Sequence, residues 1–239
     1  MENYIEGRKF LKSQWEKLSD IKSDQQKGVN PPERFLGYDE NNVICLSDFS
    51  TLPTRTVLET IKKRTTKRKF KEGKIPQDKL SYLLWATQGL REDKGKYTFR
   101  TVPSAGARHS FETYLYVKGV EGLKEGIYRY IPEKHGLIFL KEKDDVLLSK
   151  ALLNQTFNSQ VIFFWSCIPY RMEWRYSIVS HKMIAIDIGH VCQNLYIAAE
   201  SVDLGVCAIG AYSQENADKL LGLDGNDEFV IYAAHVGKA

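Results

Sequence analysis

The sequence lacks several features that would define a protein class at once. No apolar run approaches the roughly 20 residues that a membrane-spanning helix needs. The N-terminal residues lack the basic and then apolar layout of a secretory signal. We therefore expect a cytoplasmic protein with no membrane partner. The net charge is only +4 over 239 residues, which is too small for a nucleic-acid coat, so we expect no nucleic-acid partner either.

Cysteine and histidine are too few and too scattered to indicate a metal centre. The four cysteines include no C-x-x-C pair, and Cys167, Cys192 and Cys207 lie in apolar segments, which favours buried free thiols. The five histidines show no metal-ligand spacing. His190 falls within a helical pattern and is expected to be an interior histidine. The sequence predicts no metal site.

Three common enzyme motifs are absent as well: G-x-G-x-x-G, G-x-x-x-x-G-K-[ST] and G-x-S-x-G. Their absence argues against a Rossmann dinucleotide site, a phosphate-binding P-loop and a serine nucleophile on a strained turn. What remains is a chain with 43% hydrophobic residues, enough for one sizeable core. We expect a single domain over residues 1–239, in which residues 1–50 form an N-terminal helix and an arm.

The N-terminal part is mostly polar. Leu11, Trp15 and Leu18 are spaced as on one face of an amphipathic helix. Residues 23–32 are polar and contain two prolines, which is typical of a linker or of an arm laid over another subunit. The sequence leaves these two alternatives open.

From residue 54 onward, helices and strands follow one another without strict alternation, which predicts an α+β fold. Helices are expected around Val57, Leu58 and Ile61, between Pro76 and Gly89, after Asp144 as N-cap, and after Ser213. Strands are expected at 111–117, 127–130, 137–140, 161–168, 206–211 and 229–236.

The strongest helix signal lies between residues 185 and 205. Apolar side chains recur there at alternating steps of three and four, and Gly205 supplies the stop. The members of this stripe are Ala185, Ile188, Cys192, Leu195, Ala199 and Val202. Such a stripe is buried either in a domain core or in a subunit interface.

Residues 62–70 (KKRTTKRKF) form the first candidate site. Guanidinium groups bind two phosphate oxygens at once, and threonine hydroxyls add neutral donors. Composition alone favours a solvated basic face. A nucleic-acid patch is a third alternative, which is weakened because Phe70 is the only aromatic residue in the run.

Two further stretches are rich in small residues. Residues 103–108 (PSAGAR) precede a strand, and small side chains there let a flat ring or a phosphate approach the backbone. Residues 208–211 (AIGA) end a buried strand and could present main-chain N–H groups to a ligand. A plain turn and a plain strand end are the alternatives.

Taken in order, these stretches resemble the nitroreductase family, and more narrowly its SagB-type dehydrogenase branch. Residues 64–70 (RTTKRKF) resemble the family's R-R-S-x-R-x-[FY] signature, and 103–108 resemble its P-S-A-G-A-R loop. Residues 187–195 (DIGHVCQNL) resemble its long-helix signature, and 208–211 its strand end near the flavin. Residues 84–89 (LWATQG) and 23–25 (SDQ) also fit this branch.

The resemblance implies a three-layer α+β fold, in which helices flank a central, mostly antiparallel sheet. It also implies a homodimer with the long helix at the two-fold interface, which would account for the apolar stripe, and two FMN sites between the subunits. Arg64 and Arg68 would hold the phosphate with help from Thr66 and Lys238, while Thr65 replaces a family arginine. The remaining implied contacts to the flavin ring are Pro103, Ser104, Ala105 and Gly106 from the other subunit, Gln155, and the N–H of Ile209 or Gly210 at flavin N5.

The implied activity is that of an FMN-dependent oxidoreductase. Hydride would pass from NADH or NADPH through flavin N5 to an undefined small-molecule acceptor, of which nitroaromatics and quinones are plausible types. One alternative is a dehydrogenase or oxidase of azoline rings in a modified peptide, where Arg175 and Tyr176 would replace a Lys-Tyr pair that takes protons. Arginine is a poor base because it stays protonated. The other alternative is a flavin-binding protein without turnover.

Overall fold

The computed structural model describes residues 4–239, and a seven-stranded sheet forms its centre. The strand order is β1-β6-β5-β4-β7-β9-β8, and every neighbouring pair is antiparallel. The strands are β1 (Val43–Cys45), β4 (Phe111–Val117), β5 (Gly126–Ile131), β6 (Gly136–Lys141), β7 (Val161–Cys167), β8 (Leu204–Ile209) and β9 (Phe229–Lys238). A separate hairpin pairs β2 (Leu90–Asp93) with β3 (Thr98–Arg100). The predicted antiparallel sheet is thereby confirmed.

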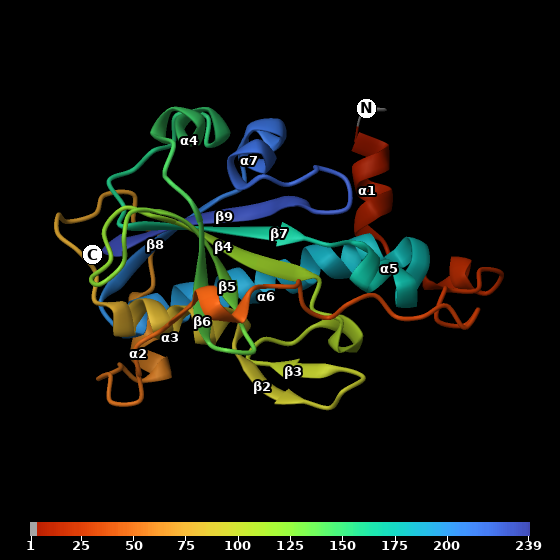
Figure 1. The fold of residues 1–239 in the computed structure, drawn as a ribbon. Helices are drawn as coiled ribbons and strands as arrows, with labels where there is room; N and C mark the ends of the chain where they lie inside the picture. The colour runs from red at the N-terminus through yellow and green to blue at the C-terminus, as the bar shows by residue number, and fades with distance from the viewer. Residues whose placement is uncertain (1–3) are drawn as a thin grey trace.

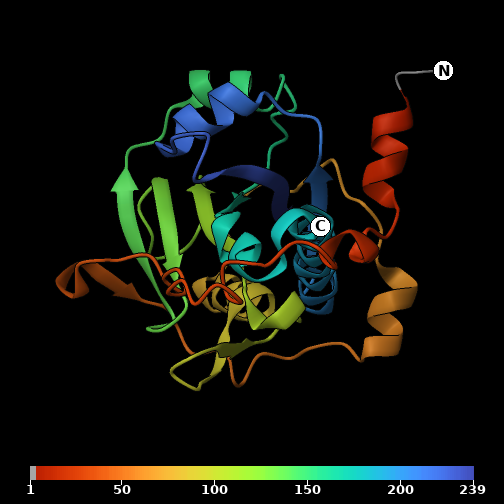
Figure 2. The same cartoon turned by 90° about the vertical axis from the view of Figure 1, so that its right-hand side faces the viewer.

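Helices cover both faces of the sheet (Figures 1 and 2). One face packs against α3 (Gln77–Gln88) and α6 (Ser180–Ser201), and the other against α4 (Asp145–Ala151) and α7 (Gln214–Leu221). Along β7, Phe163 and Trp165 point into the first core and Phe164 into the second. Side chains that alternate between two cores explain why this strand is continuously apolar. The structure confirms a three-layer α+β fold.

Local signals placed several helix ends correctly. The carboxylate of Asp144 accepts a hydrogen bond from the Leu147 N–H at 2.8 Å and caps α4. Pro76 and Gly89 flank α3 as expected. The remaining helical segments are α1 (Ile5–Leu11), η2 (Trp15–Leu18), η3 (Glu40–Asn42), α2 (Val57–Lys63), η4 (Ala105–Ala107), α5 (Tyr170–Tyr176) and η5 (Ser177–Val179).

The apolar stripe of α6 faces the core of its own chain. Ile188, Cys192, Leu195 and Ala199 are buried and belong to the core that α6 shares with α3 and the sheet. Burial in the chain's own core accounts for these four residues, whereas Ala185 of the same stripe is exposed. The position of the long helix at a dimer interface stays a prediction. A helical pattern shows that a face is covered, but it does not show by which chain. The exposed side of α6 carries Ala185, Ile186, Gly189, His190 and Gln193, so His190 is a surface residue and not an interior one.

The N-terminal residues depart from the predicted continuous helix. The helical segments α1 and η2 are separate. Leu11 remains 68% exposed, and Trp15, 47% exposed, packs edge-on against the Tyr176 ring. The arm that follows lies over α5 of its own chain. The Gln25 N–H donates to the Trp174 carbonyl at 2.9 Å, and the Trp174 indole N–H donates to the Val29 carbonyl at 2.8 Å. In this chain the segment is an arm on the chain's own surface.

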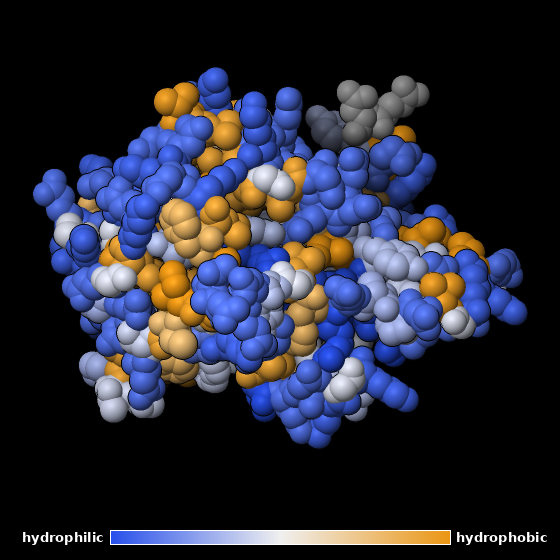
Figure 3. Space-filling model, in the orientation of Figure 1, coloured by the Kyte–Doolittle hydropathy of each residue, from blue (hydrophilic) through white to orange (hydrophobic). Residues whose placement is uncertain are grey.

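The view in Figure 3 shows a largely hydrophilic face, on which apolar side chains gather in separate groups. Within residues 4–239, no helix is both long and apolar enough to cross a membrane. Cys167, Cys192 and Cys207 are buried free thiols as predicted, and Cys45 is an exposed one.

Candidate functional site

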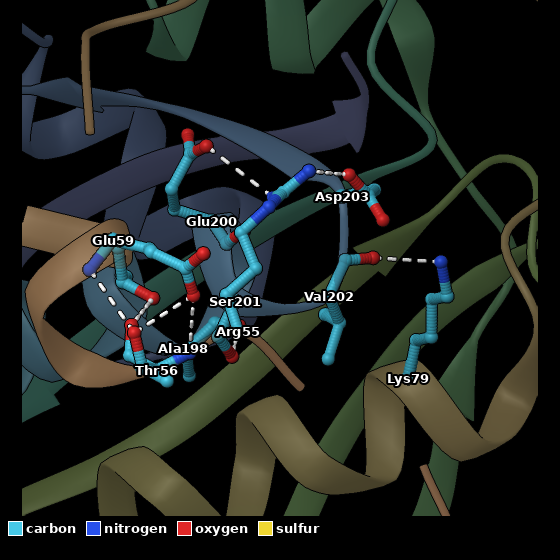
Figure 4. Close-up of polar contacts among 10 residues, drawn as sticks. Arg55, Thr56, Glu59, Lys79, Ala198, Glu200, Ser201, Val202 and Asp203 are labelled. Atoms are coloured by element: carbon cyan, nitrogen blue, oxygen red, sulfur yellow. Dashed lines mark hydrogen bonds and ion pairs between the residues drawn. The ribbon is translucent and has the colours of Figure 1, made fainter. Parts of the chain in front are cut away.

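The segment that carries the basic run is anchored at the C-terminal end of α6. Arg55 donates to the Glu200 carbonyl and forms ion pairs with the carboxylates of Glu200 and Asp203 (Figure 4). A cation is favoured there because the last carbonyls of a helix carry partial negative charge. The next helix, α2, begins with a capping box, in which the side chains of Thr56 and Glu59 accept each other's backbone N–H. These contacts fix where the basic run begins.

Beyond α2 the chain runs along β8, an edge strand of the sheet. Thr66 forms a parallel bridge with Val206, and the Lys67 N–H donates to the Val206 carbonyl at 2.9 Å. The outer N–H and C=O groups of an edge strand have no neighbouring strand to bond to. The basic run supplies a hydrogen-bond donor to one of them, the Val206 carbonyl. Arg68 follows beside the Cys207 thiol. Burial raises the pKa of Cys207, and the positive charge of Arg68 opposes that shift.

Tyr196 of α6 links the basic run to β8. Its hydroxyl accepts a hydrogen bond from the Ala208 N–H at 2.9 Å and lies 3.3 Å from Thr66 Oγ1. The Arg64 guanidinium lies over the Tyr196 ring, with 5.5 Å between Cζ and the ring centroid. Three parts of the molecule therefore meet at one side chain.

The cations of this group have no carboxylate partner. Within residues 4–239, Arg64, Arg68 and Lys238 form no ion pair. Lys238 ends β9, and its carbonyl accepts a hydrogen bond at 3.0 Å from the N–H of Lys71, just past the basic run, while its Nζ lies beside Gly73. Thr65 and Thr66 are exposed alongside. Guanidinium groups without a counter-charge, next to exposed threonine hydroxyls, are a donor set suited to a phosphate.

The end of β8 presents a backbone N–H away from the sheet. The Ala208 N–H leaves the ladder for Tyr196, so alternation along the strand directs the Ile209 N–H toward β9. The same alternation, continued past the end of β8 at Ile209, would direct the Gly210 N–H outward. The surroundings of Gly210 are open, because the nearest heavy atom to a Cβ built there is 4.0 Å away. Of the two residues considered from the sequence, Gly210 is the better placed to offer a donor to a ligand.

Gln155 braces the turn that follows β8. Its Nε2 donates to the Ala211 carbonyl at 2.7 Å and to the Leu152 carbonyl at 3.1 Å. The backbone carbonyl of Gln155 lies 2.8 Å from Nε2 of His235. On the other side of the same ring, the Ser159 hydroxyl lies 2.7 Å from Nδ1. Burial lowers the pKa of His235 to about 4. The ring is therefore neutral at pH 7, with one donor nitrogen and one acceptor nitrogen.

The second group of candidate residues is the loop 103–108, which a buried carboxylate holds on α6. Asp187 Oδ2 accepts hydrogen bonds from the Ser104 hydroxyl at 2.7 Å and from the Ala105 N–H at 3.0 Å. Ser104 Oγ in turn accepts the His109 N–H at 2.9 Å. Burial raises the pKa of Asp187, and its two hydrogen bonds oppose this shift. Pro103 is exposed where the loop begins.

Gly106 lies directly against Arg175 and Tyr176 of α5. A Cβ at this position would be 2.5 Å from the Tyr176 hydroxyl and 3.1 Å from Arg175 Nε, and the backbone there is left-handed, with φ +58°. Glycine meets both demands. The Arg175 guanidinium lies 5.5 Å from the centroid of the Tyr176 ring. Since arginine stays protonated, this pair supplies a fixed positive charge and not a base.

The two groups do not meet within one chain. Asp187 holds the loop and Tyr196 contacts the basic run, and they are nine residues apart on α6. Nine residues of α-helix correspond to about 14 Å along the axis and to two and a half turns, so the two side chains project to opposite sides. Within residues 4–239, no hydrogen bond or ion pair joins the loop to Arg64 or Arg68. The structure therefore places the predicted residues in two separate groups.

Residues 61–238 match the model of the nitroreductase family. The chain belongs to the nitroreductase family. A nitroreductase-like protein of Methanocaldococcus jannaschii is 32% identical to it over 181 residues, which cover 74% of this chain and 88% of that protein. The trifolitoxin-processing protein TfxB of Rhizobium leguminosarum is 27% identical over 143 residues, which cover 54% of this chain and 37% of TfxB.

Solved structures show the same nitroreductase fold. A nitroreductase-type protein from Ralstonia eutropha has a TM-score of 0.70 at 22% identity, over 88% of this chain and 97% of that one. The Escherichia coli microcin synthetase McbBCD complex gives 0.62 at 17% identity, over 92% and 83%. A nitroreductase from Desulfovibrio desulfuricans, solved in complex with FMN, gives 0.53 at 16% identity, over 77% and 86%.

Sequence reasoning missed three residues that hold the candidate segments in place. Asp187 lay inside the quoted long-helix signature without a role, although a carboxylate beside an apolar stripe is unusual enough to indicate one. Tyr196 and His235 gave no local signal, because their contacts join segments far apart in the chain. Within residues 4–239, no group of three or more His, Cys, Asp and Glu side chains could hold a metal ion.

Proposed function

We propose that this chain binds FMN and acts as an NAD(P)H-dependent oxidoreductase. The supporting observation is the row of donors along the outer edge of β8. Arg64, Arg68 and Thr66 offer cations and a hydroxyl without a carboxylate partner, and the Gly210 N–H ends the row. FMN carries a phosphate dianion and a flat ring with hydrogen-bond acceptors, which these residues fit. Charge-assisted hydrogen bonds contribute about 1.5–3 kcal/mol each, so two or three would hold the phosphate firmly.

We further propose that the working unit is a homodimer with shared sites. The loop 103–108 and the basic run, the two half-sites of this proposal, lie on opposite sides of α6, which favours a flavin held between residues of different chains. Apolar surface is available for a second copy. Val57, Leu58 and Ile61 on α2 are 60–67% exposed, and α2 stands at the margin of the molecule in Figure 2. Exposed apolar patches of this kind favour protein–protein contact.

The chemistry in this proposal belongs to the cofactor, which would supply hydride transfer at N5 between NADH or NADPH and an organic acceptor such as a nitroaromatic or a quinone. The chain supplies position and charge. Arg64 and Arg68 bind the phosphate, Gly210 donates its N–H to the ring, and Asp187 keeps the loop 103–108 in shape. No side-chain nucleophile is required.

A second candidate is dehydrogenation of azoline rings in a modified peptide. It is favoured by the partial similarity to TfxB, whose name describes the processing of trifolitoxin, and by the position of Tyr176 against Gly106. Arg175 weakens it, because a guanidinium does not take up a proton at neutral pH. Tyr176 would then have to move the proton alone. This candidate predicts activity on an azoline peptide that depends on a cyclising partner.

One experiment separates these functions. The visible spectrum of the purified protein is recorded with and without added FMN, and NADH and NADPH are then added without oxygen. We expect flavin absorbance that at least one nicotinamide bleaches. Bound flavin that neither nicotinamide bleaches would favour a flavin-binding protein without turnover, or the peptide dehydrogenase. No flavin absorbance even after FMN is supplied would overturn the whole proposal.

A further inference from the structure

A cavity of about 530 Å³ lies between the arm, the tip of the β2–β3 hairpin, the loop 103–108 and α5. Figure 1 shows the arm and the hairpin on the side of the molecule where α5 lies. Its apolar walls come from Pro31 and Pro32 of the arm and from Trp174, and Tyr97 reaches in from the hairpin tip. Trp174 is 8% exposed and Tyr97 42%, so one ring is a buried wall and the other lies at the opening, where it packs against Phe99.

The charges around this cavity are unbalanced. Four of the twelve residues that line it are cations, namely Arg34, Lys96, Arg108 and Arg175, whereas Glu33 is the single acid. Arg34 is neutralised by Asp93 at 2.6 Å. Within residues 4–239, the other three cations form no ion pair.

Arg108 is the most confined of these cations. It is 7% exposed, its Nε donates to the Arg171 carbonyl at 2.6 Å, and its guanidinium lies 4.7 Å from the centroid of the Trp174 ring. Burial lowers the pKa of Arg108, and the charges of Arg175, Arg171 and Arg34 add to that shift. A positive field that the chain itself does not neutralise is therefore focused on an apolar cavity, where an anion would be stabilised.

We propose that this cavity binds a small aromatic carboxylate. The carboxylate would lie among Lys96, Arg108 and Arg175, since guanidinium forks match its planar shape. The aromatic body would pack against Trp174 and Tyr97. The volume is that of an ordinary small-molecule site, with mostly apolar walls and a few converging polar groups. The proposal goes beyond flavin binding. None of the lining residues belongs to the basic run, but Gly106 belongs to the loop 103–108, so the titrations are made with and without FMN to separate the two proposals.

Calorimetric titration of the whole protein with naphthoate and with its neutral amide tests the proposal. We expect naphthoate to bind at least tenfold more tightly than the amide, because only the acid is attracted by the cations. Arg175→Gln and Lys96→Gln should each weaken naphthoate binding by roughly tenfold while leaving the amide unaffected. The matched control is Lys94→Gln. This lysine lies on the same hairpin but pairs with Glu92 and does not line the cavity, so naphthoate affinity should be unchanged.

Several outcomes would overturn the proposal. Equal affinity for the acid and the amide would show that the cations do not select an anion. Inorganic phosphate binding as tightly as naphthoate would show that the aromatic walls contribute nothing. Unchanged affinity in both glutamine variants, with their circular dichroism preserved, would place any binding elsewhere. The titrations are repeated with FMN present, and a protein that binds naphthoate but no FMN would overturn only the flavin proposal.

Discussion

Asp187 and Tyr196 project from opposite sides of α6, one holding the loop 103–108 and the other contacting the basic run. The helix therefore holds the two groups of candidate residues apart, and these groups are the half-sites of the proposed dimer. It is well suited to this role because its apolar stripe is buried in the core of its own chain. A change in the position of α6 would displace both half-sites together, which links packing of the core to the geometry of the site.

Removing one guanidinium from the basic run should weaken FMN binding. In Arg68→Ala, the phosphate loses one charge-assisted contact of about 1.5–3 kcal/mol, which corresponds to a loss of affinity of roughly ten- to a hundredfold. Fluorescence titration with FMN measures this loss. Lys69→Ala is the matched control, since it removes the neighbouring cation of the same run and should leave the affinity nearly unchanged. An unaltered FMN dissociation constant in Arg68→Ala would remove the phosphate assignment.

The link between Asp187 and Ser104 should appear as a coupling energy. Asp187→Asn disturbs two buried hydrogen bonds and is expected to lower the free energy of unfolding by about 1–3 kcal/mol, and Ser104→Ala by about 1 kcal/mol. Because both changes remove the same contact, the double variant should be less destabilised than the sum of the two single variants. Urea unfolding of the four proteins measures this. Strict additivity would mean that the 2.7 Å contact does not stabilise the loop.

Local chemistry explains why much of the fold could be predicted. Asp144 caps its helix through atoms three residues away, and Pro76 and Gly89 act through their own backbones. The continuous helix predicted through Leu11 and Trp15 was wrong: Trp15 packs on the Tyr176 ring, with the ring centroids 5.7 Å apart, whereas Leu11 stays 68% exposed, so the two do not share one buried face. The spacing of apolar residues shows which face of a helix is apolar. Whether another part of the chain packs on that face depends on the whole fold.

The candidate site was predictable only in part, for the same reason. The members of each motif are neighbours in sequence, so motif order indicated the basic run and the loop 103–108. The residues that hold these segments in place lie far away in the chain. Tyr196 reaches Thr66 across 130 positions, and Asp187 reaches Ser104 across 83. No sequence period connects such pairs, because helix packing on the sheet brings them together.

The buried His235 should make the protein lose stability in mild acid. Its pKa is lowered by burial from 6.5 to about 4, so between these values the unfolded chain binds a proton that the folded chain does not. The stabilising contribution is complete above pH 6.5 and is lost as the pH falls toward 4, amounting to about 2 kcal/mol between pH 7 and pH 5.

Urea unfolding at pH 7 and pH 5 measures this contribution. Between pH 7 and pH 5, the free energy of unfolding of His235→Gln should fall by about 2 kcal/mol less than that of the unaltered protein. This difference does not depend on how stable the variant is at pH 7. His190→Gln is the control, because this histidine is exposed on α6. The same pH dependence in the His235 variant and in the unaltered protein would show that another group causes the acid sensitivity.

A mixed dimer tests whether the two half-sites come from different chains. Arg68→Ala damages the basic run. Gly106→Ala displaces the loop, because its Cβ would be 2.5 Å from the Tyr176 hydroxyl in a left-handed backbone. Homodimers of either variant should bind FMN weakly at both sites. In a mixed dimer with shared sites, one site carries both changes and the other carries neither, so one intact site returns.

The two chains are produced together with different affinity tags, the mixed dimer is purified over both, and its flavin content is measured. We expect about one FMN per mixed dimer, against two for a doubly tagged dimer of unaltered chains. If both half-sites served a flavin of their own chain, each chain of the mixed dimer would carry one change and no intact site would form. A flavin content no higher than that of the two variant homodimers would therefore rule out the shared site, even if the protein binds FMN.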